Sequence, residues 1–320
     1  MSECLSPGAE EVGKAGKNGD KRAGGTGFVF HEQYVNHTLG KGHRESPERL
    51  RAILRRMKAT GLDRLVKTIR PSGDPLPFIK AVHPEAHIRR VAEQAHDESI
   101  CRLAVAGALA AVDAVCRGKV MNAFCALRPP GHHAADAGRN GYCFYNNVAI
   151  AARYAQKKHK LNRVLIVDWD YHRGNGTEWA FYEDPSVLVF STHERKAVPG
   201  TGFAERKGKG SGLGYNINVP LPPGANDRAI LDAFESKMAP AANRFKPDLV
   251  LISAGFDSRE GDLLGDFAVT DDGFAKLTRR MMAIAQTHAG SRLVSALEGG
   301  YNVEGLASAV ESHVRTLLGE

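Results

Sequence analysis

Six short apolar runs recur along this 320-residue chain, and segments with helical periodicity separate most of them. The runs occupy residues 27–31, 122–127, 163–169, 186–193, 248–255 and 292–299. The expected helices occupy residues 46–61, 100–118, 143–159, 229–245, 271–290 and 305–319. Strands that alternate with helices form βαβ units, which assemble into a largely parallel sheet covered by helices. The sequence therefore predicts an α/β fold.

The domain organisation is simple, because no internal repeat and no internal linker divides the chain. We expect one domain over residues 25–320 and, over residues 1–24, a flexible tail rich in Gly, Lys and Ala. The tail lacks the apolar block of a secretory signal, and no unbroken apolar run is long enough for a membrane span.

Composition narrows the functional class. The five cysteines are odd in number and form no CxxC pair, which favours a reducing, cytoplasmic setting over a disulfide or cysteine-zinc framework. The net charge of +7 is spread along the chain, and no nucleic-acid-binding motif accompanies the short lysine-rich runs at 157–160 and 207–209. We therefore expect neither nucleic acid nor a membrane as a partner.

Four groups of polar residues follow four of the predicted strands directly. They are RPPGHHA (128–134), DWDYH (168–172), GFDS (255–258) and EGGYN (298–302). The C-terminal ends of parallel strands meet at one edge of a sheet, and ligands bind in the crevice there. We therefore expect the four groups to form one site.

A metal site is the first expectation for this edge. Residues two apart in an extended chain point to the same side, so Asp170 and His172 can face one point, and Asp257 can add a second carboxylate from another strand. A single Asp at a strand end is usually a turn former or helix cap, but three such ligands on strand ends favour a catalytic zinc with an open position. Asp168 lies deeper on the same side, where it could orient a histidine or bind another cation.

Proton transfer is the second expectation, because His132 and His133 stand in tandem after Pro-Pro-Gly and imidazole titrates near neutral pH. Asp168 could hold His132 in one tautomer, and Asn175 could do the same for His133. Tyr301 follows two glycines and could aim its phenol at an oxyanion, although a buried core tyrosine is the alternative interpretation.

Taken in order, these motifs resemble the zinc-dependent histone deacetylase family, in particular the class II-like deacetylases and their bacterial relatives, which include acetylpolyamine amidohydrolases. The similarity runs from about Gly27 to the C terminus. Its blocks are GHRESPERL (42–50), LRPPGHHA (127–134), GYCFYNNVAIAARYA (141–155), DWDYHRGNGTE (168–178), PGTG (199–202), YNINVPLPPG (215–224), SAGFDSREGDLLG (253–265) and LEGGYN (297–302). The resemblance implies a single arginase-like α/β domain with a central eight-stranded parallel sheet flanked by helices.

The resemblance also implies an activity, the removal of acetyl or other acyl groups from an acylated amine. Asp170, His172 and Asp257 would bind one Zn²⁺. His133 would serve as general base and then as general acid, with His132 and its partner Asp168 as electrostatic support. Tyr301 would bind the carbonyl oxygen as it becomes an oxyanion.

Substrate and structural-ion sites follow from the same resemblance. Gly141 would accept a substrate contact at the tunnel wall, and Tyr142 would form an apolar face. Family members also carry structural K⁺, and its expected site here uses Asp168, Asp170 and His172 together with Ser191 and Thr192.

The chain departs from the family pattern at several positions. Arg173 stands where the family usually has a second His, so the charge beside the metal ligands differs. Ala197 and Val198 replace an aromatic pair, which should widen the tunnel and relax selectivity against bulkier stems or acyl groups unless Phe203 fills the gap. Leu264 occupies a position where polyamine-selective relatives place an acidic residue, so we expect acyl-lysine or a small neutral acylamide to be preferred over an acetylpolyamine.

Five points stay open at the level of the sequence. The rim loop 95–100 is not a close match, so Asp97, Glu98 and Ser99 are only candidates for gripping the substrate backbone. A binuclear manganese hydrolase shares the fold, but GFDSRE lacks the DxD pattern that two metals use. A non-catalytic acyl-ligand binding module is a further alternative. Such a module would not need the intact set of catalytic residues that this chain carries. Zinc or iron(II) as the native metal, and a possible homo-oligomer, are likewise left undecided.

Overall fold

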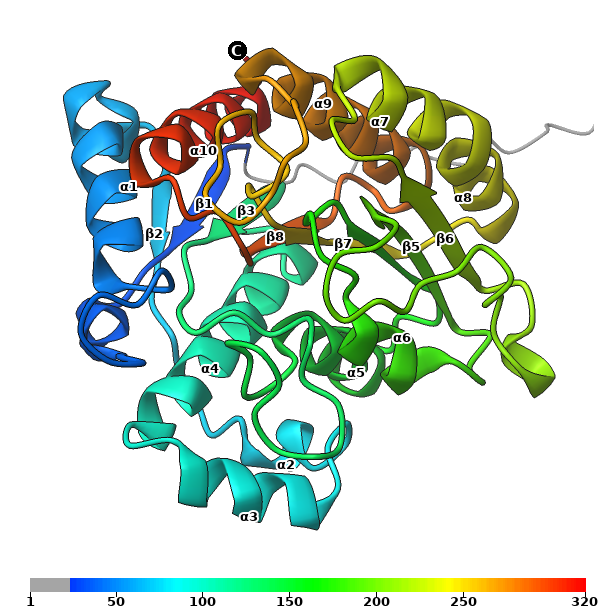
Figure 1. Ribbon diagram of the computed structural model, residues 1–320, viewed down its shortest axis with the longest axis horizontal. Coiled ribbons are helices and arrows are strands. Elements are labelled where there is room, and N and C mark those ends of the chain that lie inside the picture. The colour runs from blue at the N-terminus through cyan, green and yellow to red at the C-terminus, as the bar shows by residue number, and fades with distance from the viewer. Residues whose placement is uncertain (1–23) are drawn as a thin grey trace, which may run out of the picture.

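The computed structural model describes residues 24–320, which form one eight-stranded sheet between two layers of helices (Figure 1). The strands are β1 Thr26–Val29, β2 Lys67–Ile69, β3 Asn122–Cys125, β4 Val164–Asp168, β5 Val187–Glu194, β6 Asn216–Leu221, β7 Leu249–Ala254 and β8 Leu293–Leu297. Their order in the sheet is β2-β1-β3-β8-β7-β4-β5-β6, and every neighbouring pair is parallel. The predicted α/β class and the eight-stranded parallel sheet are confirmed. The predicted flexible tail falls on residues 1–23, outside the described residues, and on Gly24.

The helices cover both faces of the sheet. Their bounds are α1 Pro47–Ala59, α2 Leu76–Ile79, α3 Glu85–Gln94, α4 Glu98–Cys116, α5 Asn147–His159, α6 Asn175–Phe181, α7 Asp227–Ala233, α8 Ala239–Phe245, α9 Asp271–His288 and α10 Val303–Leu318. In Figure 1, α10, α9, α7 and α8 lie above the sheet, α1 packs beside α10 at the left edge, and α4, α5 and α6 lie below the sheet with α2 and α3 further out. The central strands β3, β4, β7 and β8 are fully buried between these layers.

Two strands of the sheet, β2 and β6, were not predicted from the apolar runs, and they are the two edge strands. The side chains of β2 are mostly exposed, and those of β6 are only half buried. Edge strands need no continuous apolar run, and β6 contains Pro220, which is tolerated at an edge because its missing N–H breaks no ladder bond there. The residue pattern alone therefore underestimated the width of the sheet.

Two predicted helices differ in detail from the structure. The helix expected over 143–159 begins only at Asn147, because Asn146 is its N-cap and accepts the N–H of Ala149. The helix expected over 229–245 contains a π-helical turn at Phe234–Met238. That turn ends two residues before Pro240, which lacks the N–H needed for a regular i−4 bond.

One helix of the described chain, α4, is long and apolar enough by length and composition to cross a membrane. In the fold, 72% of its apolar window is buried inside the protein, and core helices pass the same test. Arg102 and Asp113 also interrupt its apolar sequence. The helix is therefore weak evidence for a membrane span.

Candidate active site

Three of the predicted metal ligands converge at the C-terminal ends of β4 and β7. Nδ1 of His172 lies 3.1 Å from Oδ1 of Asp170 and 3.0 Å from Oδ2 of Asp257. One ligand atom from each residue lies within 4.8 Å of the other two. Both carboxylates are buried, and His172 is partly exposed. The strand-end geometry inferred from the sequence thus places these three side chains around one point.

The backbone packs closely against the outer sides of the two carboxylates. The N–H of Gly299 donates to Oδ2 of Asp170 at 2.8 Å, and the N–H of Tyr171 donates to Oδ1 of Asp257 at 2.9 Å. A Cβ at position 299 would lie 2.1 Å from Oδ2 of Asp257, and one at Gly255 would lie 2.1 Å from Oδ2 of Asp170. Glycine is therefore required at both positions for the carboxylates to keep their places.

The charges of this cluster favour the binding of a cation. Burial and the negative charge of Asp170 raise the pKa of Asp257 to about 7. Burial opposes protonation of His172, but its bonds to the two carboxylates raise its pKa to about 11. Buried carboxylates that repel each other are stabilised by a positive charge between them. Two carboxylate oxygens and one imidazole nitrogen are a donor set that suits Zn²⁺ in a three-ligand site.

The two tandem histidines have opposite environments. Nδ1 of His132 lies 3.0 Å from Oδ2 of Asp168, and Nδ1 of His133 lies 2.8 Å from Oδ1 of Asn175. Burial disfavours the charged form of His132, but Asp170 and Asp168 outweigh burial and raise its pKa to about 10. Burial and the positive charge of His132 lower the pKa of His133 to about 3. One imidazole is therefore held charged beside a neutral one.

The hydrogen bond to Asn175 also decides the tautomer of His133. An amide oxygen only accepts, so Nδ1 of His133 carries the proton and Nε2 keeps its lone pair. The partners that the sequence suggested for His132 and His133 are the ones the structure pairs with them.

Tyr301 is buried beside the cluster and is held from two sides. Oδ2 of Asp262 accepts the N–H of Tyr301 at 2.7 Å. Nε of Arg49 donates to the carbonyl of Gly300 at 2.6 Å, and its guanidinium carbon lies 5.1 Å from the centre of the Tyr301 ring. The hydroxyl of Tyr301 has no hydrogen-bond partner among residues 24–320. The phenol is thus fixed in place while its O–H is still available to a ligand.

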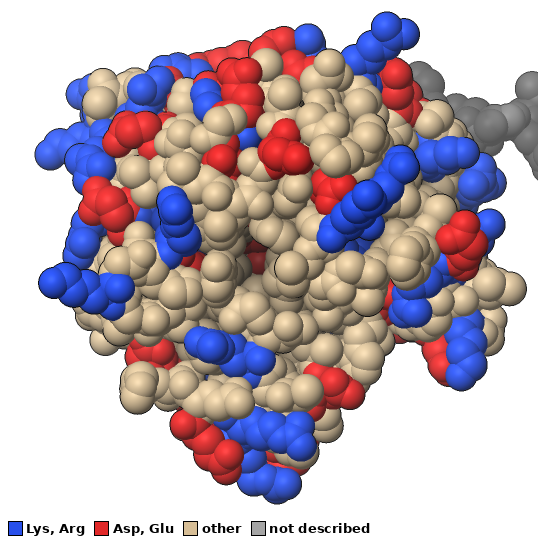
Figure 2. All heavy atoms as spheres, in the orientation of Figure 1, with Lys and Arg blue, Asp and Glu red and all other residues tan. Residues whose placement is uncertain are grey.

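A cavity of about 290 Å³, which we call the site cavity, opens above these residues. Its lining residues are Pro130, His132, His133, Gly141, Tyr142, Cys143, His172, Val198, Leu264, Gly299 and Tyr301. All four predicted substrate-binding residues therefore line one cavity. Near the middle of the molecular face, Figure 2 shows a hollow surrounded largely by uncharged residues, with carboxylate atoms at its bottom.

Val198 lies at the mouth of the site cavity, because its side chain is 75% exposed, whereas Asp170 and Asp257 are at most 1% exposed. Phe203 is 58% exposed and is not among the lining residues, so it does not restore the wall. The extra width left by valine therefore lies at the entrance to the cavity.

The matching family model is the histone deacetylase domain, and it covers residues 43–317. The chain belongs to the histone deacetylase family. Family membership makes it a hydrolase of acyl-amide bonds, in a family that is generally zinc-dependent.

Individual relatives agree with this assignment. A probable deacetylase of Archaeoglobus fulgidus is 38% identical over 297 residues, which cover 88% of this chain and 82% of the relative. The polyamine deacetylase HDAC10 of Homo sapiens is 38% identical over 92% of this chain, but the chain spans only 48% of that protein. The crystal structure of the HDA15 HD domain matches with a TM-score of 0.88 and 34% identity over 93% of this chain and 89% of that one.

The rim residues of this chain that were candidates for contacting the substrate lie outside the site cavity, and the two acidic ones bond to other side chains. Asp97 accepts from Nδ1 of His37 at 2.9 Å, and Glu98 accepts from the hydroxyl of Tyr145 at 2.6 Å. Neither acid, nor Ser99, is among the residues that line the site cavity. The structure therefore does not support them as substrate contacts.

Arg173, the departure from the family histidine, is buried in an ion-pair network. Its Nη2 donates to Oε2 of Glu178 at 2.6 Å, and Arg206 donates to Oε1 of Glu178 at 2.6 Å. A Cβ at Gly202 would lie 2.7 Å from Cδ of Arg173. The arginine therefore packs against the PGTG segment instead of facing the metal ligands, and Glu178 is a structural residue that the sequence pattern did not single out.

We expect this network to make the free energy of unfolding depend on pH in the acid range. Burial opposes ionisation of Glu178, but Arg173 and its hydrogen bonds lower its pKa from 4.5 to about 2. The stabilisation is therefore complete above about pH 4.5 and is lost as the pH falls towards 2. Over that window the unfolding free energy of the wild type should fall by about 3 kcal/mol more than that of Glu178→Gln, as measured by urea unfolding at a series of pH values. Parallel pH profiles for the two proteins would contradict the assignment.

Two further residues that the sequence pattern did not reveal, His83 and His87, hold the segment 135–146 in place. Their rings stack with centres 4.1 Å apart. Nδ1 of His83 bonds to the carbonyl of Ala135 at 2.6 Å, and its Nε2 accepts the N–H of Asn146 at 3.0 Å. Nε2 of His87 bonds to the carbonyl of Phe144 at 2.7 Å, and its Nδ1 accepts the N–H of Gly138 at 3.0 Å. Each ring thus uses both nitrogens and must be neutral, which matches the lowered pKa values of both histidines.

The clamped segment carries Gly141 and Tyr142, so loosening it should affect substrate binding. His87→Phe keeps a ring but removes both of its bonds to the segment. We expect KM for an acyl-lysine substrate to rise about tenfold, with a smaller change in kcat, because the wall is displaced while the metal ligands are not. His159→Phe is the matched control, since within residues 24–320 the ring of His159 hydrogen-bonds only to Asp113, at 2.7 Å and away from the cavity. Equal KM values for the two variants would show that the clamp does not position the wall.

Proposed function

We propose that the chain is a zinc-dependent deacylase whose substrate is an acyl-lysine or a small neutral acylamide. The observation that carries the proposal is the convergence of Asp170, His172 and Asp257 below a cavity that is also lined by His133 and Tyr301. Zinc bound to the three ligands would polarise the amide carbonyl and lower the pKa of bound water to about 7. The remaining chemistry falls to the side chains of this chain.

The proton steps are assigned to the two histidines. His133 lines the cavity, keeps a lone pair on Nε2, and receives the proton of the attacking water there. The same Nε2 then returns a proton to the nitrogen of the departing amine. His132 is held by Asp168 and places positive charge 4.1 Å, ring centre to ring centre, from His133. This charge favours release of the proton from His133 to the amine.

The phenol of Tyr301 is assigned to the carbonyl oxygen. Its O–H is available, and the contacts with Asp262 and Arg49 around it hold the ring, so the donor needs no reorganisation when negative charge develops. Tyr142 packs against Tyr301 with ring centres 5.8 Å apart. Its ring also lines the site cavity and is assigned to the apolar wall that contacts the substrate stem.

The cavity lining supports a neutral substrate. None of the eleven residues that line the site cavity is an Asp or Glu, and Leu264 occupies the position where a carboxylate would attract a second ammonium. Hydrolysis of an acetylpolyamine is the second candidate, because one relative at 38% identity is named a polyamine deacetylase.

A binuclear metal site and a non-catalytic binding module are less well supported. Ser258 donates to the carbonyl of Trp169 at 2.8 Å, and Arg259 pairs with Asp271 at 2.7 Å, so neither adds a ligand for a second metal. The free hydroxyl of Tyr301 and the base tautomer of His133 argue against a mere binding module.

Several of the expectations from the sequence stay predictions. They are a structural K⁺ at Asp168, Asp170, His172, Ser191 and Thr192, a possible homo-oligomer and a cytoplasmic location, and the choice between zinc and iron(II) as the native metal stays open. One relative carries the name "Histone deacetylase 14, chloroplastic", so relatives do not all share one compartment.

Removing the phenol oxygen tests the catalytic assignment. Tyr301→Phe should lose on the order of a hundredfold in kcat while it keeps its bound zinc, because only a donor to the oxyanion is lost. Elemental analysis and turnover of an acetyl-lysine peptide, with and without chelator, measure the two properties. Tyr154→Phe is the control, since its hydroxyl bonds to Asp113 outside the site. A Tyr301→Phe enzyme with the turnover of the control would make Tyr301 purely structural.

Exchange of the wall residue tests the substrate assignment. The wild type should prefer acetyl-lysine peptides over acetylspermidine in kcat/KM, and Leu264→Glu should shift that ratio towards acetylspermidine by about tenfold, because a carboxylate would face the second ammonium. Leu263→Glu adds the same charge at the exposed neighbouring position, outside the cavity lining, and should shift the ratio much less. A wild-type preference for acetylspermidine would make the polyamine interpretation the correct one.

A further inference from the structure

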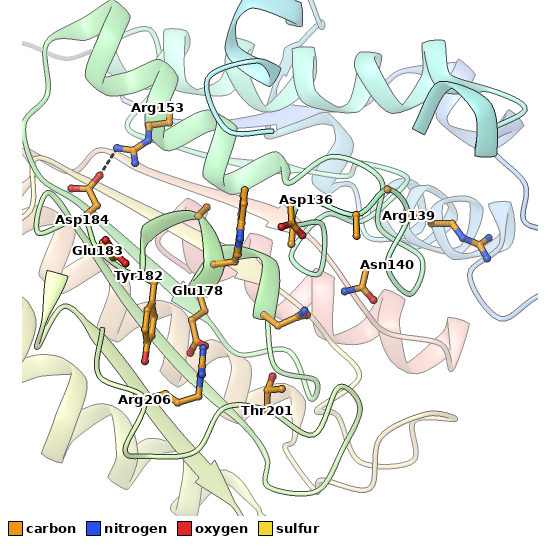
Figure 3. A pocket seen from close by; sticks show the side chains of 16 residues that line it. Asp136, Arg139, Asn140, Arg153, Glu178, Tyr182, Glu183, Asp184, Thr201 and Arg206 are labelled. Carbon is orange, nitrogen blue, oxygen red and sulfur yellow. Dashed lines mark hydrogen bonds and ion pairs between the residues drawn. The ribbon is translucent and has the colours of Figure 1, made fainter. Parts of the chain in front are cut away.

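A second and larger cavity, which we call the side cavity, lies next to the site cavity and has a volume of about 1060 Å³ (Figure 3). Its walls come from α6, from the segment 135–140, from residues 182–184 and from Thr201 and Arg206. The volume is in the range of sites that hold a small-molecule ligand. None of the roles assigned above uses this space.

Residues that are adjacent in the chain or bonded to each other line the two cavities. Asn140 lines the side cavity, and the next residue, Gly141, lines the site cavity. Asn175 lines the side cavity and bonds to His133 of the site cavity at 2.8 Å. Figure 3 shows Asn140 and Thr201 towards one end of the side cavity and Arg153 with Asp184 at the other. The end with Asn140 is therefore the end that adjoins the active site.

Near the mouth of the site cavity, few side-chain atoms separate the two cavities. Val198 lines the site cavity, and Thr201, three residues later, lines the side cavity. Gly141 adds no side chain, and a Cβ at Gly200 would meet no atom within 4 Å. A group that leaves the site cavity past Val198 thus meets little side-chain bulk before it reaches the side cavity.

The charges in the side cavity are mostly neutralised from within. Arg153 pairs with Asp184 at 2.5 Å, and Arg206 pairs with Glu178 at 2.6 Å. Glu183 pairs with Lys209 at 3.0 Å. The two lining charges without a side-chain hydrogen bond or ion pair in the described chain, Asp136 and Arg139, are exposed and of opposite sign. The side cavity therefore offers no net charge to an ionic ligand.

What the side cavity offers instead is an aromatic surface. Trp179 lines it, is 42% exposed, and has no aromatic or cationic partner among the described residues. Thr201 also lines the side cavity, is exposed, and can hydrogen-bond to a ligand. Unpartnered indole on a concave surface favours a flat uncharged group, since ring pairs gain energy beyond the area they bury.

We infer that the side cavity is a substrate subsite that takes the amine-side body of the acylated amine and prefers an uncharged aromatic group there. The inference rests on the proposed deacylase function and names the class of substrate. The amine side is the relevant one because the metal-binding carboxylates lie at the bottom of the site cavity, where the acyl carbonyl must bind, whereas Val198 lies at the exposed mouth.

The test compares two capped acetyl-lysine substrates that differ only in the C-terminal amide, which is a methylamide or a benzylamide. For the wild type, kcat/KM of the benzylamide should exceed that of the methylamide by about fivefold to tenfold. Trp179→Ala should bring this ratio close to one, because the ring loses its partner, and Val198→Phe should do so by closing the passage. Leu65→Ala removes another exposed apolar side chain, outside both cavities, and should keep the wild-type ratio.

A binding measurement separates failure of this inference from failure of the proposed function. Trp179 and the buried Trp169 are the two tryptophans of the chain, so the product amine lysine benzylamide should quench the fluorescence of the wild type but not that of Trp179→Ala. Turnover without a benzylamide advantage, or an advantage that survives in both variants, would overturn the subsite. Stronger turnover of substrates with a cationic or anionic C-terminal amide than of the benzylamide would overturn its preference for an uncharged ring. Absence of turnover for every acyl amide, with Trp179-dependent quenching intact, would contradict the deacylase function but keep the subsite.

Discussion

Two buried carboxylates that face one imidazole, Asp170, Asp257 and His172, are the constraint around which the active-site edge of this fold is organised. Uncompensated, their mutual repulsion in a buried site would oppose folding, and a divalent cation removes that penalty. The backbone N–H groups of Tyr171, after β4, and of Gly299, after β8, donate to the outer oxygens, and Gly255 and Gly299 leave these oxygens the space they need. The metal-binding requirement therefore explains why glycine stands at positions 255 and 299.

Buried polar side chains hold the loops that carry the chemistry. Glu298 accepts the N–H of Gly131 at 2.7 Å and that of His132 at 3.1 Å, and burial raises its pKa to about 7. His83 and His87 hold the next part of the same loop from below. Loops without a core of their own would be too mobile to keep a base and an oxyanion donor in register, so these internal bonds provide the preorganisation that catalysis needs.

The same loops also form the boundary between the site cavity and the side cavity. The segment 135–142 separates the site cavity from the side cavity. Arg173, which is bonded to Glu178, packs against the PGTG segment, and Thr201 of that segment lines the side cavity. Substitutions at this divide, such as valine at position 198, leave the metal site intact because they lie at the mouth and not at its base. Chemistry and substrate choice are thereby set by different parts of the chain, which allows substrate choice to change while the reaction is kept.

The sequence by itself determined the α/β class, the positions of the six apolar strands, and the three side chains that converge on one point, because strand periodicity and the common edge of a parallel sheet leave few alternatives. It also identified Asp168 and Asn175 as the histidine partners. Only the tertiary structure revealed the edge strands β2 and β6, the stacked pair His83 and His87, the bond partners of Asp97, and the cavity beyond Val198. These depend on contacts between residues far apart in the chain, and neither local periodicity nor a motif encodes which surfaces those contacts bring together.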